Sequence, residues 1–180
     1  MIFQPLSLKD AMLVRPEPLE DARGFFARLF DRDEFMVHGL PYQFVQSSLS
    51  FNARKGTVRG MHYQVEPYAE SKYVRVEQGA IYDVIVDLRP DSPTYQQWIS
   101  VDLSAQNHHM LYIPKGFAHG FQTLSDNTCV HYIMDTPFFP NAAKAFRYND
   151  PIFQISWPEA VSVISFKDSH YPDFSSIQEA

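Results

Sequence analysis

The stretch GTVRGMHYQ places Arg59 and His62 three residues apart, within a run that has the composition of a β-strand. A strand buried in a core prefers apolar side chains at such positions. One interpretation is a surface strand whose polar face meets water. The other is a functional site, because a guanidinium binds anions through paired N–H groups and an imidazole exchanges a proton near neutral pH.

The spacing of this pair makes a geometric prediction. Successive side chains of a strand point to opposite faces, so residues three apart lie on opposite faces of a regular strand. For Arg59 and His62 to reach one pocket, the strand must be bulged or sharply twisted near Gly60. Glycine is the residue that such an irregularity favours. A flat strand with Arg59 pointing away would exclude that residue from an anion site.

A second stretch, YIPKGFAHGF, carries His119 after a turn at Pro114 and Gly116. The spacing P-x-G-x-x-H resembles the second motif of the cupin jelly roll, in which the histidine points into the mouth of the barrel. In metal-binding cupins this histidine acts together with a His-x-His pair and a glutamate. Here His62 is followed by tyrosine and glutamine, and two imidazoles alone make a poor metal site. We expect no metal, and a hydrogen-bonded core histidine is the alternative for His119.

The elements that must position these residues have the pattern of short strands. Further strands are predicted from alternation and from β-branched and aromatic content at 44–52, 72–76, 80–88, 98–104, 110–114 and 128–134. Three residues ending in Gly79 separate the second and third of these runs, which is a common hairpin form. Both faces of the run at 80–88 carry apolar residues, so both should be covered. One short helix is expected over 29–38, and the whole pattern favours an antiparallel sandwich or barrel.

Length and composition indicate one domain. The chain has 180 residues, with 15% aromatic residues and 13 prolines, which favours short strands joined by turns over a helical bundle. We expect a single domain over 1–180. It should have an N-terminal strand arm over about 1–45 and an irregular, proline-rich C-terminal segment over about 140–180 that wraps the barrel.

Charge and cysteine content exclude several classes. The net charge of −6 argues against nonspecific nucleic-acid binding, although a local basic cluster can still bind an anionic small molecule. The single cysteine, Cys129, cannot form an internal disulfide, which favours a reducing compartment and hence the cytoplasm. No signal peptide and no apolar run of membrane-spanning length is visible, so no membrane partner is expected.

Five segments together resemble the dTDP-4-dehydrorhamnose 3,5-epimerase family. They are DARGFFARLF, GTVRGMHYQ, AESKYVRVEQGAIYDVIVDLRPDSPTY, YIPKGFAHGFQTLSD and RYNDPIFQISWP, and they occur in the family's order and spacing. The resemblance implies an all-β, cupin-type jelly roll (a double-stranded β-helix) with short peripheral helices. It also implies a homodimer with exchanged strands, no metal or other cofactor, and a nucleotide-diphosphate-linked 4-keto-6-deoxyhexose as substrate.

The resemblance also implies catalytic roles for four residues. His62 resembles the base that removes a proton from the carbon next to the keto group, and Asp168 resembles the carboxylate paired with that base. Lys72 resembles the cation beside the enolate oxygen. Tyr132 resembles the acid that reprotonates the sugar from its opposite face. Contacts to the diphosphate and sugar are implied for Arg59, Arg23 and His119, and contacts to the nucleotide for Phe26 and Gln46.

The chemistry of this set is coherent without the resemblance. A C–H bond next to a carbonyl is acidic only because the anion delocalises onto oxygen, and inversion needs a base on one face and a proton donor on the other. A histidine suits the base near neutral pH, and an aspartate on its far nitrogen fixes the tautomer. A preorganised ammonium stabilises the developing oxyanion, which is typically the largest single contribution.

Three departures from the family bear on which reaction runs. The usual Asp-Asn-His-Ser is replaced by serines and a leucine at 47–50, including Ser48, and the usual glutamate after GFF is replaced by Arg28. Both changes lie near the expected nucleotide site. Since a guanidinium donates hydrogen bonds where a carboxylate accepts them, a CDP-linked substrate is an alternative to a dTDP-linked one. A usual pair of tyrosines is Phe138 and Phe139 here, which concerns the sugar pocket.

We therefore predict epimerisation at C3, C5 or both, serving deoxysugar synthesis for a cell-surface polysaccharide or a glycosylated metabolite. Three other classes remain open at this point. They are a sugar-nucleotide 3,4-ketoisomerase on the same fold, a metal cupin, and a non-catalytic module that binds sugar nucleotides.

Overall fold

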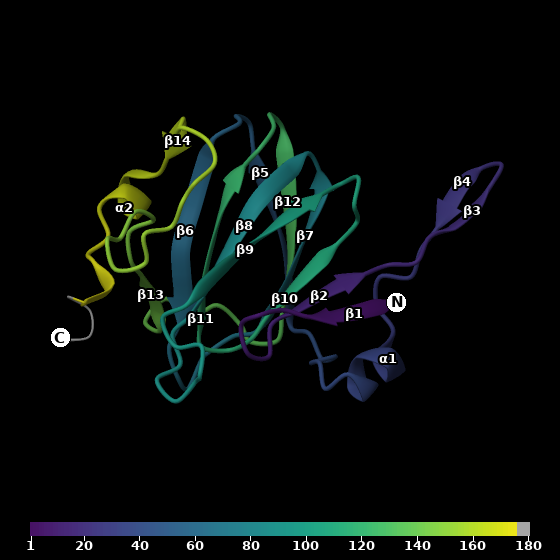
Figure 1. Ribbon diagram of the computed structural model, residues 1–180, viewed down its shortest axis with the longest axis horizontal. Coiled ribbons are helices and arrows are strands. Elements are labelled where there is room, and N and C mark those ends of the chain that lie inside the picture. The colour runs from purple at the N-terminus through teal and green to yellow at the C-terminus, as the bar shows by residue number, and fades with distance from the viewer. Residues whose placement is uncertain (176–180) are drawn as a thin grey trace.

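Two facing β-sheets form the body of the protein. The computed structural model describes residues 1–175, so the last five residues of the expected C-terminal wrap lie outside the described part. Apart from one short parallel pair, every strand pairing in the described residues is antiparallel. This architecture, with two short helices beside the sheets, is the all-β jelly roll that the sequence predicts (Figure 1).

The first sheet has the strand order β1-β2-β10-β7-β12-β5. Its strands are β1 (Ile2–Pro5), β2 (Met12–Arg15), β10 (Met110–Ile113), β7 (Lys72–Gln78), β12 (Thr128–Met134) and β5 (Gln46–Asn52). The second sheet has the order β13-β6-β11-β8-β9, and β14 runs parallel to the start of β6. Its strands are β13 (Ala143–Ala145), β6 (Thr57–Gln64), β11 (Phe117–Thr123), β8 (Ala80–Asp87), β9 (Trp98–Ser104) and β14 (Val163–Ile164).

The main core lies between the two sheets. Val74 and Val130 of the first sheet pack in one cluster with Ile85 and Phe121 of the second. A second cluster joins Val84 and other residues from the outer face of β8 to aromatic residues of the C-terminal segment, namely Phe146, Phe153 and Phe174. Both faces of β8 are therefore covered, as its sequence predicts.

The predicted hairpin between β7 and β8 is wrong. Strand β7 pairs with β10 and β12 in the first sheet, whereas β8 pairs with β9 and β11 in the second. Gly79, with φ of +80°, turns the chain from one sheet into the other, and a Cβ there would lie 2.6 Å from the Ser125 Oγ. Local alternation identifies the strands but does not reveal which sheet each one joins.

The irregularity predicted near Gly60 is present in β6. His119 lies opposite His62 and Phe121 lies opposite Arg59, so three steps along β6 match two steps along β11. Gly60 has φ of +128°, and a Cβ there would lie 2.5 Å from the Cα of Gly120. The close approach of the two strands requires glycine, and the extra residue brings Arg59 and His62 to the same face.

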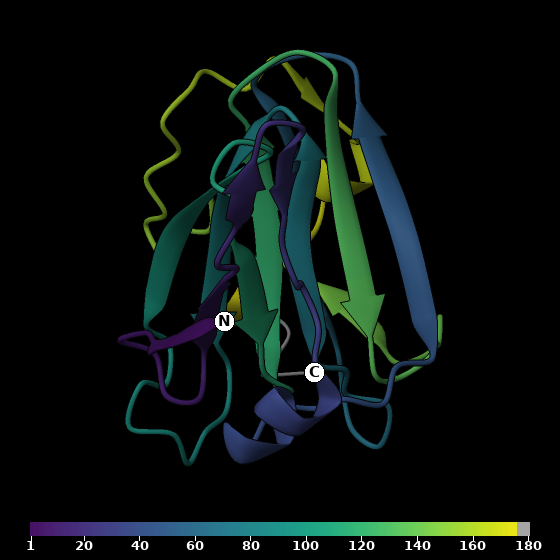
Figure 2. The ribbon, with the colours of Figure 1, turned by 90° about the vertical axis from the view of Figure 1, so that its right-hand side faces the viewer.

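An arm projects from the barrel on the side opposite the C-terminal segment (Figures 1 and 2). It is a two-stranded hairpin of β3 (Leu19–Asp21) and β4 (Gly24–Phe26). Helix α1 (Arg32–Val37) follows, shorter than the predicted 29–38; Asp31 caps it, and the buried Phe35 packs with Tyr73 of the first sheet. Helix α2 (Phe166–Ser169) lies beside β6. None of the described helices is long and apolar enough to cross a membrane.

Candidate active site

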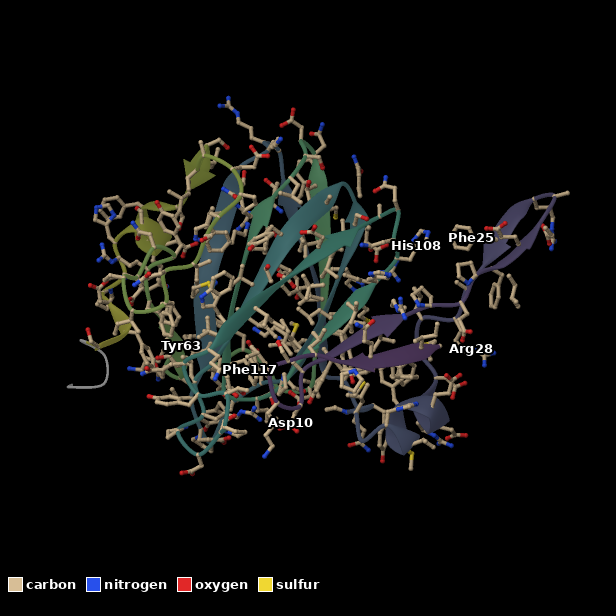
Figure 3. The ribbon with its side chains drawn as sticks, in the orientation of Figure 1. Asp10, Phe25, Arg28, Tyr63, His108 and Phe117 are labelled. Carbon is tan, nitrogen blue, oxygen red and sulfur yellow. The ribbon has the colours of Figure 1, made fainter. Side chains whose placement is uncertain are left out.

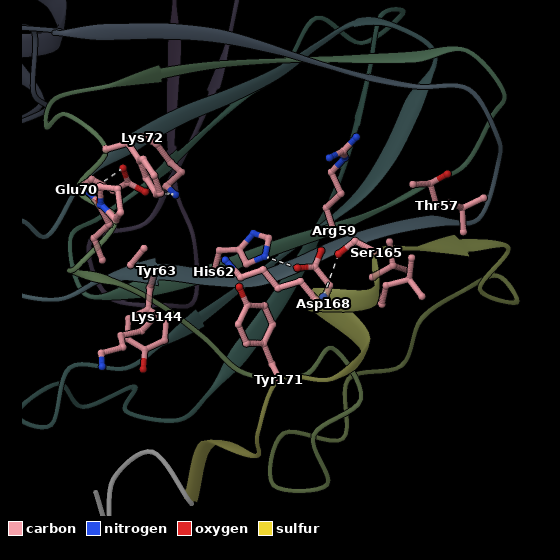
Figure 4. A pocket seen from close by; sticks show the side chains of 18 residues that line it. Thr57, Arg59, His62, Tyr63, Glu70, Lys72, Lys144, Ser165, Asp168 and Tyr171 are labelled. Atoms are coloured by element: carbon pink, nitrogen blue, oxygen red, sulfur yellow. Dashed lines mark hydrogen bonds and ion pairs between the residues drawn. The ribbon is translucent and has the colours of Figure 1, made fainter.

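His62 of strand β6 and Asp168 of helix α2 form a histidine–carboxylate pair beside the second sheet. The His62 Nε2 lies 2.8 Å from the Asp168 Oδ1. Because a carboxylate only accepts, Nε2 carries the hydrogen and Nδ1 is left free to accept a proton. The His62 side chain is 46% exposed and the Asp168 side chain only 9%. The imidazole is thus open to a ligand, while its partner is held behind it (Figure 4).

Local structure fixes the position of Asp168. Ser165 caps the short helix α2, and its side chain accepts a hydrogen bond from the Asp168 backbone N–H. The Gly60 N–H points at the Asp168 Oδ2 from 3.5 Å, a contact that the irregular strand provides. Burial opposes ionisation of Asp168, but the contacts with His62, Gly60 and Ser165 hold its pKa below the usual range. The carboxyl is therefore an anion that orients the ring and stabilises its protonated form.

A cavity of about 650 Å³ opens in front of this pair. Four cationic side chains line it against two carboxylates, although the whole chain has a net charge of −6. The cations are Arg59, Lys72, Lys144 and Lys167, and the carboxylates are Glu70 and Asp168. The cavity thus gathers the local positive charge that an anionic ligand requires.

Lys72 lies at one end of the cavity and is almost buried. Its ammonium donates to the Glu70 Oε1 at 2.6 Å, and the two side chains are 9% and 13% exposed. Arg59 lies toward the other end (Figure 4). Its Nε donates to the Asn52 Oδ1 at 2.7 Å, which anchors the guanidinium to β5.

Register places Tyr132 on the inner face of the first sheet. Tyr132 lies directly opposite Val74, a residue of the core between the sheets, and also opposite Ser48. Since cross-strand partners share a face, Tyr132 and Ser48 both face the barrel interior. By alternation Lys72 and Gln46 share that face. Gln46 accepts a hydrogen bond from the Phe138 N–H at 2.8 Å, and Phe138 lines the cavity.

His119 also faces the interior, but it does not line the cavity. It is 5% exposed, and its Nε2 lies 2.5 Å from the Oδ1 of Asp83, which is fully buried. Burial raises the pKa of Asp83, while His119 and Lys72 oppose that shift. His119 is thus part of a buried hydrogen-bonded pair, and its expected contact with the substrate stays a prediction.

Tyr132 lies beside this buried pair. Its ring centroid is 6.0 Å from that of His119, in an edge-to-face contact. Burial raises the pKa of the Tyr132 phenol, Asp83 raises it further, and Arg59 has the opposite effect. Tyr132 is absent from the lining of the cavity, which does include the phenol of Tyr171; the Tyr171 ring lies 6.1 Å from the His62 ring.

The arm residues are not brought to the cavity within one chain. Arg23 is 90% exposed and pairs with Asp21 of the same hairpin, and Phe26 is 68% exposed. Arg28 pairs with Asp31 at 3.2 Å. Figure 3 shows Phe25 and Arg28 at the opposite side of the molecule from Tyr63, which lines the cavity.

Several site residues were not predicted from the sequence. Asp83 had one signal, a carboxylate between Ile81 and Ile85 on the face of β8 that packs in the main core. No sequence signal marked the other four residues. Glu70 reaches the cavity from a loop, Lys144 from edge strand β13, and Lys167 and Tyr171 from the C-terminal segment. In residues 1–175, no three His, Cys, Asp or Glu side chains gather as a metal site requires.

The fold is a cupin-type jelly roll, and its cavity holds a histidine–carboxylate pair and cations whose chemistry suits an acid–base enzyme. The family model described as dTDP-4-dehydrorhamnose 3,5-epimerase matches residues 5–176. The chain belongs to that family, and it is an isomerase of the epimerase type.

Individual relatives agree with the family model along nearly the whole chain. A dTDP-4-dehydrorhamnose 3,5-epimerase of Sinorhizobium fredii is 41% identical over 173 residues, covering 96% of this chain and 89% of the relative. The crystal structure of the Bacillus anthracis epimerase with TDP and PPi bound has a TM-score of 0.93 at 42% identity, covering 96% of this chain and 99% of that one. The Legionella pneumophila epimerase in complex with dTDP-4-keto-L-rhamnose has a TM-score of 0.90 at 35% identity, with coverage of 98% and 94%.

Proposed function

We propose that this enzyme epimerises C3, C5 or both in a nucleotide-linked 4-keto-6-deoxyhexose, with dTDP as the carrier. The observation that carries the proposal is the His62–Asp168 pair, which faces a cavity lined by Lys72 and other cations. The relatives support the substrate class, since one is bound to TDP and another to dTDP-4-keto-L-rhamnose.

In the proposed reaction His62 is the base. Its Nδ1 takes the proton from the carbon next to the carbonyl, and Asp168 stabilises the imidazolium that forms. The electron pair of the C–H bond moves into the carbonyl and gives an enolate. The Lys72 ammonium stabilises the enolate oxygen, because a fixed charge in a nearly dry site need not reorganise during the reaction.

Tyr132 is the proposed acid on the opposite face of the sugar. It projects inward from the first sheet, whereas His62 projects from the second. Burial and the neighbouring Asp83 raise its pKa, so the phenol keeps its proton until the enolate carbon takes it. Inversion follows because the proton is removed from one face and returned to the other.

The diphosphate is assigned to the cationic side chains of the cavity. Arg59 is held by Asn52 and Phe51 through two of the five N–H donors of a guanidinium, and its other donors can bind oxyanions. Lys144 and Lys167 are exposed at the cavity and add positive charge. The cytoplasmic location suggested by the single Cys129 is compatible with such a substrate.

We further propose that the enzyme is a homodimer with exchanged strands. The arm leaves apolar side chains in solvent, including Leu19 at 71% and Phe26 at 68%, and edge strand β5 exposes Leu49 and Phe51. Apolar groups of this size usually mark an interface. A second copy would cover β5 and receive the arm, which would carry Arg23, Phe26 and Arg28 to the nucleotide end of the partner's site.

A CDP-linked substrate is the second candidate, and Arg28 favours it, since a guanidinium suits the acceptor atoms of cytosine. However, the ion pair with Asp31 gives Arg28 a partner on its own arm, so dTDP stays the proposed carrier. Titration with dTDP and CDP tests this choice. Much tighter binding of CDP would reverse it.

The function is tested by incubating the enzyme with dTDP- and CDP-4-keto-6-deoxyglucose in deuterated water and following the products by NMR. We expect deuterium at C3, C5 or both, with inversion and without movement of the ketone. A ketone that moves to C3 would instead show a 3,4-ketoisomerase. Binding without any exchange would show a non-catalytic module.

A further inference from the structure

The carboxylate of Glu70 is a charged group of the cavity that the proposed reaction does not use. It lies 2.6 Å from the Lys72 ammonium, at the end of the cavity where the enolate oxygen is assigned (Figure 4). Both side chains are nearly buried, so the pair is a desolvated and directional feature of the site. This feature is not explained by stabilisation of the enolate, because a second negative charge beside the ammonium opposes it.

Glu70 is held in place from its other side by Gln64. The Gln64 Nε2 donates to the Glu70 Oε2 at 3.3 Å and to two backbone carbonyls, those of Tyr68 and Pro137. The Gln64 Oε1 accepts from the Phe139 N–H at 2.6 Å. Gln64 is 4% exposed, so this network keeps the carboxylate at a fixed position beside the ammonium. A preorganised acceptor of this kind can select a ligand group at little further cost in entropy.

The two side chains together present a donor next to an acceptor. An ammonium donates three hydrogen bonds, and a carboxylate only accepts. A carbonyl flanked by a hydroxyl presents the complementary pattern, and its two oxygens lie about one hydrogen-bond length apart. We propose that Glu70 determines specificity by accepting the hydroxyl that neighbours the keto group, while Lys72 binds the carbonyl oxygen. This proposal rests on the proposed function and defines the substrate as an α-hydroxy ketone.

The pair would also orient the sugar ring. In a 4-keto-6-deoxyhexose, C3 carries a hydroxyl, whereas C5 carries the ring oxygen and a methyl group. The C3 side is therefore the flank of the carbonyl that can donate to Glu70. The ring is bound with C3 toward Glu70 and C5 away from it.

The test compares two substrates in the parent enzyme and in a variant of Glu70. Deuterium exchange next to the carbonyl is measured as kcat/KM for dTDP-4-keto-6-deoxyglucose and for its 3-deoxy analogue, with the parent enzyme and Glu70→Ala. We expect the parent to prefer the hydroxylated substrate by about 100-fold, the value of a hydrogen bond to a charged group. In Glu70→Ala the preference should fall to within about threefold. The ratio does not depend on the fraction of enzyme that is folded.

Two further variants complete the test. Glu70→Gln keeps the size of the side chain and one neutral acceptor. Its preference for the hydroxylated substrate should lie between those of the parent enzyme and Glu70→Ala. Glu159→Ala is the control, because Glu159 is also paired with a lysine and lies 2.8 Å from the Lys55 ammonium. Neither residue of that pair lines the cavity. Glu159→Ala should keep the parent's preference.

The outcomes separate the two proposals. Exchange on both substrates with no preference in the parent would overturn the role of Glu70 and leave the epimerase assignment standing. The same conclusion follows if Glu70→Ala and Glu70→Gln both keep the parent's ratio. If neither substrate exchanges its proton in the parent enzyme, the proposed function is overturned and this inference with it.

Discussion

The barrel contains two histidine–carboxylate pairs that differ in their surroundings. His62 and Asp168 meet at 2.8 Å, with an imidazole that is nearly half exposed and a carboxylate whose pKa lies below its usual range. His119 and Asp83 meet at 2.5 Å in the interior, and burial raises the pKa of Asp83. The Asp83 Oδ2 has no hydrogen-bond partner among the described residues. The same two functional groups therefore form an open pair in one place and a closed internal pair in the other.

Under the proposed function, access to the cavity and not residue type distinguishes the open pair from the closed pair. The irregularity at Gly60 and the cap of α2 leave one imidazole nitrogen facing a cationic cavity. The regular pairing of β8 with β11 buries the other histidine. We expect substitutions in the open pair to reduce turnover and substitutions in the closed pair to reduce stability.

The largest effect on activity is expected at Tyr132, which packs on His119 and projects inward from the sheet opposite that of His62. Tyr132→Phe should reduce formation of the epimer by about 10³-fold, because the acid is lost. Exchange of the substrate proton with solvent should continue, since His62 is intact. Tyr171→Phe is the matched control at the cavity wall. If that variant, and not Tyr132→Phe, blocks epimer formation, Tyr171 is the acid.

Asp168→Asn should lower kcat by at least 100-fold, because the amide can favour the wrong tautomer and cannot stabilise the imidazolium. Its effect on stability should be small. Asp173→Asn removes a carboxylate paired with Arg147 in the same C-terminal segment and serves as the control. Steady-state kinetics and thermal unfolding of both variants measure the two effects. If Asp168→Asn and Asp173→Asn lose equal activity, Asp168 has no specific role in the reaction.

Asp83→Asn should have the opposite effect to Asp168→Asn, with a loss of stability and little loss of activity. We expect the free energy of unfolding to fall by about 2 kcal/mol, because a buried charge-assisted hydrogen bond is weakened. The kcat of the folded enzyme should change by less than tenfold. Denaturant unfolding and kinetics on the same preparation measure both quantities. A loss of turnover as large as that of Asp168→Asn would show that the closed pair also takes part in the chemistry.

A third buried carboxylate, Asp87, gives the smallest effect and a pH dependence. It has no exposed surface; although burial alone would raise its pKa, the contacts from Arg89, Ser92 and Thr94 lower it to about 2. Because the folded pKa is depressed, this stability is present above the unfolded value near 4 and is lost as the pH falls toward 2. Asp87→Asn should reduce the free energy of unfolding by about 1.5 kcal/mol at pH 7 and by much less near pH 2. A difference that does not change with pH would contradict this account.

The sequence predicts local features well where a single strand determines them. The two covered faces of β8 follow from its residues at 80–87, and the irregular strand follows from the three-residue spacing of Arg59 and His62. The hairpin at Gly79 was wrong because pairing between sheets depends on contacts that are distant in sequence.

Features assembled from distant segments could not be predicted from local pattern. The partner of His119 comes from another strand, and Glu70 reaches the cavity from a loop. The positions of Arg23, Phe26 and Arg28 depend on what the exposed arm contacts, which one chain does not determine. The assigned roles of these three residues stay predictions.

The most direct test of the central claim is the rate at which His62→Asn incorporates solvent deuterium next to the carbonyl of dTDP-4-keto-6-deoxyglucose. Binding of dTDP is measured on the same sample, so that a misfolded variant is recognised. The account predicts that dTDP binding changes by less than about threefold while deuterium incorporation falls by at least 10³-fold from the parent rate. Incorporation at the parent rate with binding intact would show that His62 is not the base.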